Sequence, residues 1–218
     1  INKLSERQAL LRKRSVEGGF PIIYVNMVGG QDELVFDGGS MVVTALGECH
    51  ALGPSYMEAL VPVVVQVGES SEGPCEIPLQ QIAPSLSLEA QVYQSLVLGV
   101  RDYARKNKFK GVVLGLSGGI DSALTLAIAA DALGSDRVQA VMMPFTFTSA
   151  MSLDLAAQQA TKLGVDYQQI SIQGVYSEFM QALEGQFANT ETDVSEQNLQ
   201  ARCRGVLLMA ISNKKGSL

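Results

Sequence analysis

The hydrophobic pattern changes character along the chain, and the change predicts two kinds of structure. Residues 4–18 carry apolar positions at helical spacing among basic residues, and Gly18-Gly19 should end this helix. From Phe20 onward, short apolar runs separated by glycine pairs predict short strands joined by tight turns. The run at 60–67 predicts one more strand, near an edge because it contains Pro62.

The second half of the chain alternates regularly between helical and strand patterns. A helix is expected from Leu88, with an apolar face formed by Val92, Leu96, Val100 and Tyr103. The elements expected after it are strand 111–116, helix 122–133, strand 138–143, helix 150–163, strand 167–172, helix 175–183 and a helix from 195 to about 213. Continuous apolar strands between helices predict an α/β fold with an open parallel sheet covered on both faces.

Residues 68–87 have the composition of a linker, with three prolines among glycines and serines. We therefore place a domain boundary near residue 80, which gives domains 1–80 and 81–218. The sequence begins without Met inside a helical pattern and ends before the predicted sheet is complete, so we interpret it as a part of a longer protein, with the sheet truncated.

Charge and cysteine spacing exclude several functions. A formal net charge of −6 over 218 residues argues against nucleic-acid binding, which usually needs a basic face. The cysteines Cys49, Cys75 and Cys203 form no CxxC or Cys/His cluster, so no zinc site is expected. The sequence has no run of about 18 apolar residues and no signal-peptide pattern, so we expect a cytoplasmic protein that does not bind membranes.

The stretch "GVVLGLSGGIDSALTLAIAA", residues 111–130, carries the most specific chemistry. An apolar strand leads into Ser117-Gly118-Gly119, and a helix begins near Ile120, so main-chain N–H groups and a positive helix end converge on one point. The stretch lacks the lysine of a Walker A loop and the spacing of a dinucleotide fingerprint. This arrangement favours a pyrophosphate group, and the simpler alternative is an ordinary tight turn before a helix.

Asp121 would repel a phosphate group unless a divalent cation lies between them, so the loop predicts Mg²⁺. In the alternative reading, Asp121 is only an acid that stabilises the first turn of a helix. A loop that holds the outer phosphates as a leaving unit suits attack at the α phosphorus. The expected chemistry is adenylation with release of pyrophosphate.

The loop "LGLSGGIDSALTLAIA" is similar to the signature of the N-type ATP pyrophosphatases, whose fold is of the adenine nucleotide alpha hydrolase-like type. Its flanks resemble one family. Residues 24–42, "YVNMVGGQDELVFDGGSMV", resemble the nitrilase-like α/β glutaminase domain of glutamine-dependent NAD synthetases. "VMMPFTFTS" and "SEQNLQARCRGVLLMAISNKKG" resemble their synthetase domain. The resemblance implies ATP-dependent amidation of deamido-NAD to NAD, with ammonia released from glutamine, and assembly into a homo-oligomer.

The resemblance also implies roles for individual residues. The ATP-binding residues would be Gly115, Leu116, Ser117, Gly118, Gly119, Ile120, Asp121 and Ser122. Asp121 would also bind Mg²⁺, Asn198 and Arg202 would contact deamido-NAD, and Lys3 would help to bind glutamine. Arg204 stays an alternative to Arg202, because the two are two positions apart and cannot share a helix face. Ser195 is the expected N-cap of the last helix.

Two departures from the family pattern keep other functions open. The family's nucleophilic cysteine would lie before residue 1, so this stretch alone should not hydrolyse glutamine, and a later nucleotide-binding segment of the family is also missing. One alternative is another adenylating enzyme of the same superfamily, acting for instance on a tRNA base. The other is a non-catalytic fragment that binds only nucleotide or partners.

Overall fold

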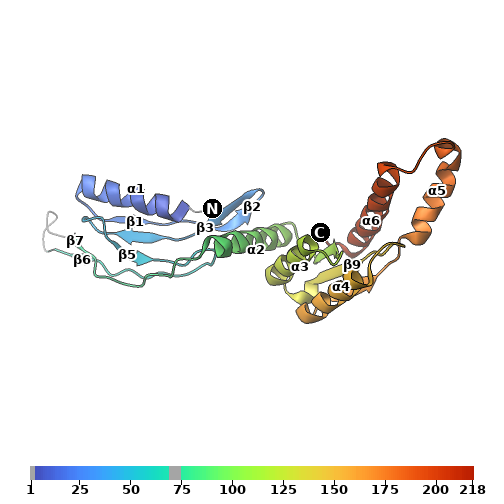
Figure 1. Ribbon diagram of the computed structural model, residues 1–218. Helices are drawn as coiled ribbons and strands as arrows, with labels where there is room; N and C mark the ends of the chain where they lie inside the picture. The colour runs from blue at the N-terminus through green and yellow to red at the C-terminus, as the bar shows by residue number, and fades with distance from the viewer. Residues whose placement is uncertain (1–2, 69–74) are drawn as a thin grey trace. The chain divides into compact units, whose positions relative to one another are not determined.

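The computed structural model describes residues 3–68 and 75–218, and the chain forms two units, Ile1–Asp102 and Tyr103–Leu218. Figure 1 shows mainly antiparallel strands with α1 in the first unit and alternating strands and helices in the second. The mixed α/β class with a parallel sheet is confirmed. The division falls inside α2, and the domain boundary near residue 80 stays a prediction.

The first unit is built on a three-stranded antiparallel sheet in the order β1-β4-β5, formed by Ile22–Tyr24, Met41–Val43 and Cys49–Leu52. Helix α1, Lys3–Gly18, covers one face, where its Leu4 and Leu11 pack against Met41, Val43 and Leu52. On the other face, Val42 and Ala51 pack against Ile77. The central strand β4 is therefore buried on both sides, which explains its uninterrupted apolar sequence.

A separate hairpin, β2 at Val28–Gln31 and β3 at Leu34–Asp37, packs against α2, Leu88–Lys106. The amide of Gly30 donates to Oδ2 of Asp102 at 2.7 Å, and a Cβ on Gly30 would lie 3.2 Å from Cα of Gly99. Gly99 and Asp102 therefore face the hairpin. The predicted apolar face is wrong in part, because Val92, Leu96 and Tyr103 are exposed whereas Val97, Leu98 and Ala104 are buried.

The strand predicted at 60–67 is largely wrong. Only Gln66–Val67 (β6) forms a ladder, with Cys75–Glu76 (β7). The side-chain amide of Gln80 instead bonds both the N–H and the carbonyl of Val64, at 2.9 and 3.2 Å, and so takes the place of a neighbouring strand. The prediction of a linker at residues 68–87 is also wrong in part, since backbone hydrogen bonds join residues 80–83 to β5. Its residues 69–74 lie outside the described part of the chain.

The second unit contains a parallel sheet in the order β10-β9-β8, as expected from the alternating pattern. Its elements are β8 at Val112–Gly115, α3 at Ile120–Leu133, the 3₁₀ turn η1 at Ser135–Arg137, β9 at Val138–Met142, α4 at Ala150–Leu163, β10 at Asp166–Gln169, α5 at Gln173–Phe187 and α6 at Val194–Lys215. Strand β10 begins one residue earlier than predicted and ends three residues earlier, although the amide of Ile170 still bonds the carbonyl of Met142.

Helices cover the sheet as the apolar strands require. Two crossovers run in the same direction, β8 to β9 through α3 and β9 to β10 through α4, so both helices pack on one face. Helix α6 packs through Cys203 and Leu207 against Val113 and Val141. Leu218 bonds Gly111 and Val113 in the parallel pattern, on the side of β8 away from β9. The chain thus turns back at β8, and such reversal points are where open α/β sheets bind ligands.

The N-cap of α6 differs from the expected Ser195. Asp193 caps the helix, because its carboxylate accepts from the amide of Ser195 at 2.7 Å and Glu196 accepts from the amide of Asp193 at 2.8 Å. An ionised carboxylate is a stronger acceptor than a serine hydroxyl, and the reciprocal pair forms a capping box.

Candidate functional site

The glycine loop lies at the carboxyl end of β8, where the reversal of strand order opens the sheet. Leu116 is 1% exposed, and its amide bonds the carbonyl of Val141 at 2.9 Å, so the strand is anchored immediately before the loop. Helix α3 begins at Ile120, directly after Gly119. The strand, loop and helix expected from residues 111–130 are therefore present in the predicted order.

Gly118 is the residue on which the loop shape depends. Its φ is +80°, in the region that favours glycine. A Cβ there would lie 2.4 Å from the carbonyl oxygen of Ser152 in α4. The loop backbone therefore lies directly against the first turn of α4, an approach that only glycine permits. Gly119 adopts ordinary extended backbone, with φ −89°.

Two serine hydroxyls fix the loop from within. Oγ of Ser117 and Oγ of Ser122 are 3.0 Å apart, and Ser122 also bonds the carbonyl of Gly119 and the amide of Ser117. The amide of Gly119 donates to Oγ of Ser117 at 3.2 Å. Because the first intrahelical bond comes from the amide of Ala123, the helix itself does not use the amides of residues 120–122. These amides and the helix dipole suit an anion at this end of α3.

A cleft of about 440 Å³ lies beside the loop. Its walls combine apolar side chains with a few polar groups, and include Gly115, Ser117, Met142, Met143, Thr148 and Arg204. A Cβ on Gly115 would lie 3.1 Å from Cε of Met143 and so would narrow this space. An apolar cleft with a few polar groups, next to a helix N-terminus whose geometry suits an anion, has the character of a ligand-binding site.

Asp121 is exposed in the first turn of α3, next to the loop amides. Among residues 3–68 and 75–218, no group of three or more His, Cys, Asp or Glu side chains could hold a metal by itself. A cation bound by Asp121 could share its coordination with phosphate oxygens and water, as Mg²⁺ commonly does.

The structure distinguishes the residues proposed for deamido-NAD. Asn198 and Arg202 are exposed on α6. Arg204 lines the cleft, and its Nε donates to the carbonyl of Met143 at 3.2 Å. Sequence spacing showed only that Arg202 and Arg204 cannot share a face. The buried Cys203 between them indicates which side of α6 faces the sheet, and its helical neighbour Leu207 lies on the same side.

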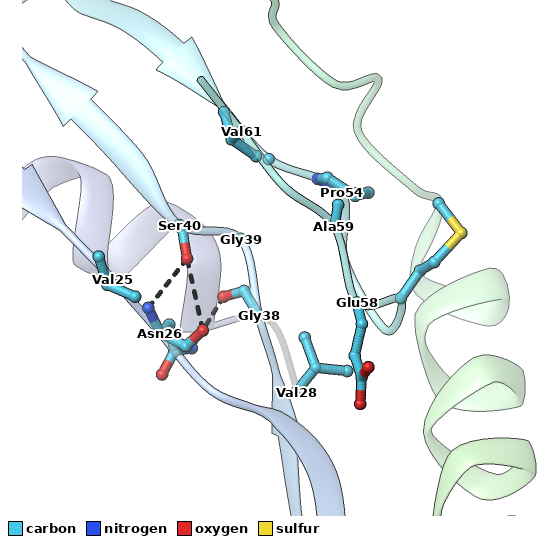
Figure 2. A pocket seen from close by; sticks show the side chains of 12 residues that line it. Val25, Asn26, Val28, Gly38, Gly39, Ser40, Pro54, Glu58, Ala59 and Val61 are labelled. Atoms are coloured by element: carbon cyan, nitrogen blue, oxygen red, sulfur yellow. Dashed lines mark hydrogen bonds between the residues drawn. The ribbon is translucent and has the colours of Figure 1, made fainter. Parts of the chain in front are cut away.

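Lys3 lines a separate cavity of about 390 Å³ in the first unit. Most of the residues in its wall are charged or polar, and include Arg7, Asn26, Glu33, Asp37 and Tyr56. Nζ of Lys3 pairs with Glu6 at 2.8 Å on the exposed surface of α1. A smaller pocket of about 190 Å³ adjoins it, and Figure 2 shows Asn26 there, bonded to Ser40 and Gly38. The sequence pattern indicated neither Arg7 nor Asp37 as a site residue.

Cys49 is not an activated thiol. Burial raises the pKa of Cys49, and the nearby Arg12 and a hydrogen bond to the carbonyl of Ala51 only partly oppose this effect. Its neighbour His50 bonds the carbonyl of Ile77. The thiol is therefore protonated at neutral pH and is a poor nucleophile.

Comparisons with known proteins agree on one family. The model of the family described as NAD synthase matches residues 92–218. A glutamine-dependent NAD(+) synthetase of Acinetobacter baylyi is 45% identical over 218 residues, which are 100% of this chain and 39% of that protein.

Among the described residues, no helix has the length and apolar character needed to cross a bilayer.

Solved structures show the same relationship. The glutamine-dependent NAD+ synthetase from Acinetobacter baumannii in complex with ADP has a TM-score of 0.92 at 45% identity, over 100% of this chain and 40% of that one. An NH3-dependent NAD synthetase from Campylobacter jejuni is 32% identical with a TM-score of 0.53, over 59% of this chain and 54% of that one. The chain spans about two fifths of the length of its two Acinetobacter relatives.

Proposed function

Since the chain belongs to the NAD synthase family, we propose that the protein containing it amidates deamido-NAD to NAD, with ATP as the activating substrate and glutamine as the source of ammonia. The second unit would bind ATP and activate the carboxylate, and the first unit would form part of the glutaminase. The single observation that carries this proposal is the loop of residues 117–119, which fits a phosphate chain through its main-chain geometry.

ATP binding is supported by residues of this chain. The phosphates would lie against the amides of residues 118–122, and the nucleoside would occupy the cleft between Gly115 and Arg204. The Acinetobacter baumannii relative was solved with ADP, which agrees with nucleotide binding by this fold. Main-chain donors suit this task because they are held rigidly by β8 and α3 before the ligand arrives.

Mg²⁺ is proposed on the chemistry of Asp121. When bound, the cation would neutralise the charge of the outer phosphates, which leave as pyrophosphate. Asp121 fits this role because its carboxylate is exposed beside the helix N-terminus, where it can share a cation with phosphate oxygens.

The remaining roles are proposed from the family resemblance together with their positions. Asn198 and Arg202 would contact deamido-NAD from the exposed side of α6, and Arg204 would reach the ligand in the cleft. Lys3 would help to bind glutamine at the cavity in the first unit. We also propose a cytoplasmic homo-oligomer, and analytical ultracentrifugation of the purified protein tests its assembly.

The deciding experiment is an assay of pyrophosphate release from ATP by the whole natural protein that carries this chain. We expect release that requires both deamido-NAD and Mg²⁺, with ammonium chloride or glutamine as the nitrogen source. Release that depends on tRNA instead would establish another adenylating enzyme. Nucleotide binding without any turnover would leave the non-catalytic alternative.

A further inference from the structure

An ion pair in the wall of the Lys3 cavity has no role in the function proposed so far. Nη2 of Arg7 donates to Oδ2 of Asp37 at 2.9 Å, and both side chains are only 20% exposed. The same nitrogen also reaches the carbonyl of Gly38 at 3.3 Å. Nε of Arg7 is buried and has no hydrogen-bond partner among the described residues. The contacts of Nη2 with Asp37 and Gly38 offset the free-energy cost of burying this guanidinium.

Asp37 connects three separate segments of the chain. Its other carboxylate oxygen accepts from the side-chain amide of Asn26 at 3.1 Å, and its carbonyl accepts from the amide of Tyr56 at 2.9 Å. Tyr56 is 7% exposed and has a φ of +60°, a conformation that costs free energy in a bulky residue. Such strain persists only where the surroundings hold it, and it gathers at functional sites.

The ion pair lies next to the first turn of α1, which begins at Lys3. Lys3 and Arg7 are four residues apart, so they lie on the same face of the helix, and both line the cavity. On this turn Leu4 packs so closely on Gly39 that a Cβ there would lie 3.0 Å from its Cδ1. By contrast, the Lys3 side chain is 63% exposed, and the carboxylate it pairs with belongs to the exposed Glu6. The position of Lys3 therefore depends on how α1 is held.

We propose that Arg7 is a positioning residue for glutamine use: its ion pair with Asp37, completed by Asn26, holds the first turn of α1 so that Lys3 is presented to the cavity. The inference rests on the proposed function, in which Lys3 helps to bind glutamine. Arg7 acts through Lys3 and the cavity wall and takes no part in bond breaking. A displaced Lys3 would weaken glutamine binding without affecting the ATP-binding loop in the other unit.

The test compares Arg7→Met, Arg7→Lys and Arg14→Met in the whole natural protein. Arg14 is the matched control, since it pairs with Glu17 at 2.9 Å on the same helix but is 64% exposed. We measure KM and kcat for glutamine as glutamate release, and separately the rate of NAD formation from ammonium chloride. Arg7→Met should raise KM for glutamine about tenfold or more and leave the ammonia-dependent rate unchanged.

Different results are expected for the conservative variant Arg7→Lys and for the control Arg14→Met. Arg7→Lys should recover most of the KM, because an ammonium can still pair with Asp37, and Arg14→Met should have no effect. An unchanged KM for glutamine in folded Arg7→Met would overturn the proposal, as would an equal loss of the ammonia-dependent rate. If Arg7→Met does not fold, Asn26→Ala replaces it under the same criteria.

Failure of the proposed function can be distinguished from failure of the proposed role of Arg7. If the unmodified protein makes no NAD from ammonium chloride, the proposed function is wrong. The response of glutamine hydrolysis to Arg7→Met still decides the role of Arg7 in that case.

Discussion

The two candidate sites are built from different parts of the chain. The loop at residues 117–119 is formed by main-chain groups within one strand-turn-helix segment, and its hydroxyls bond each other. The Lys3 cavity is formed by side chains from α1, the β2–β3 hairpin and residues 26, 56 and 95, and an ion pair joins Arg7 of α1 to Asp37 of the hairpin. Changes that alter the backbone should therefore disrupt the loop at residues 117–119. The Lys3 cavity should instead be disrupted by the loss of single charged side chains.

The largest effect is expected for Gly118→Ala, which attacks the main-chain site. The new Cβ would collide with the Ser152 carbonyl, and the positive φ adds strain, so we expect a loss of roughly 2–4 kcal/mol in unfolding free energy. Binding of Mg-ATP should become undetectable by calorimetry.

Gly205→Ala in α6 is the matched control, because no described atom other than those of adjacent residues and of the nearby helix backbone lies within 4 Å of the place that its new Cβ would take. This variant should be as stable as the parent or gain up to about 1 kcal/mol. Gly118→Ala with normal stability and normal ATP binding would show that the loop is an ordinary turn.

Asp121→Asn separates the charge in the main-chain site from its geometry. Deamido-NAD-dependent pyrophosphate release should fall roughly a hundredfold, since the variant loses its cation ligand. Because Asp121 is exposed, the unfolding free energy should stay within about 0.5 kcal/mol of the parent value. A Mg²⁺ titration of the turnover rate checks this, and an unaltered Mg²⁺ dependence would remove Asp121 from the cation site.

Asp102→Ala tests how far the Lys3 cavity depends on the hydrogen bond that joins the β2–β3 hairpin to α2. It removes the acceptor of the Gly30 amide, which joins the β2–β3 hairpin to α2, and the hairpin carries Glu33 of the cavity wall. We expect a loss of about 1–3 kcal/mol in urea unfolding, because the acceptor is charged and largely buried.

The control for this change is Asp154→Ala. The carboxylate of Asp154 accepts a hydrogen bond from Gln158 on an exposed helix face. It should alter stability by less than about 0.5 kcal/mol. Equal effects of the two variants would mean that the hairpin is held by packing alone.

The smallest effect concerns the cap of α6, the helix that carries Arg204. Two hydrogen bonds from Ser195 lower the pKa of Asp193. The bond from its amide has the larger effect and the bond from its hydroxyl the smaller one. A lowered folded pKa means that this stabilisation is present above the ordinary value of about 3.9 and is lost as the pH falls through the folded value. The Tm advantage of the parent over Asp193→Asn at pH 6 should therefore shrink as the pH falls below about 3.9 and disappear once the pH is below the folded pKa of Asp193. A difference that is independent of pH would contradict an ionised cap.

The same contrast explains what could be predicted from the sequence. The parallel sheet and the glycine loop follow from local patterns, so their order was correct from Val112 to Leu133. Val92 and Leu96 were misplaced because the burial of Val97, Leu98 and Ala104 depends on packing partners outside the helix, which helical spacing does not indicate. The hydrogen bond from Gly30 to Asp102 likewise joins residues 72 positions apart. Arg7 and Asp37 are 30 residues apart, and no local pattern indicates that they pair.

The most direct test of the account is a crystal structure of the whole natural protein with Mg²⁺ and a non-hydrolysable ATP analogue. We predict the outer phosphates within hydrogen-bonding distance of main-chain amides of residues 118–122, with the cation shared between them and Asp121. A nucleotide bound away from this loop, or phosphates held only by side chains, would contradict the central claim.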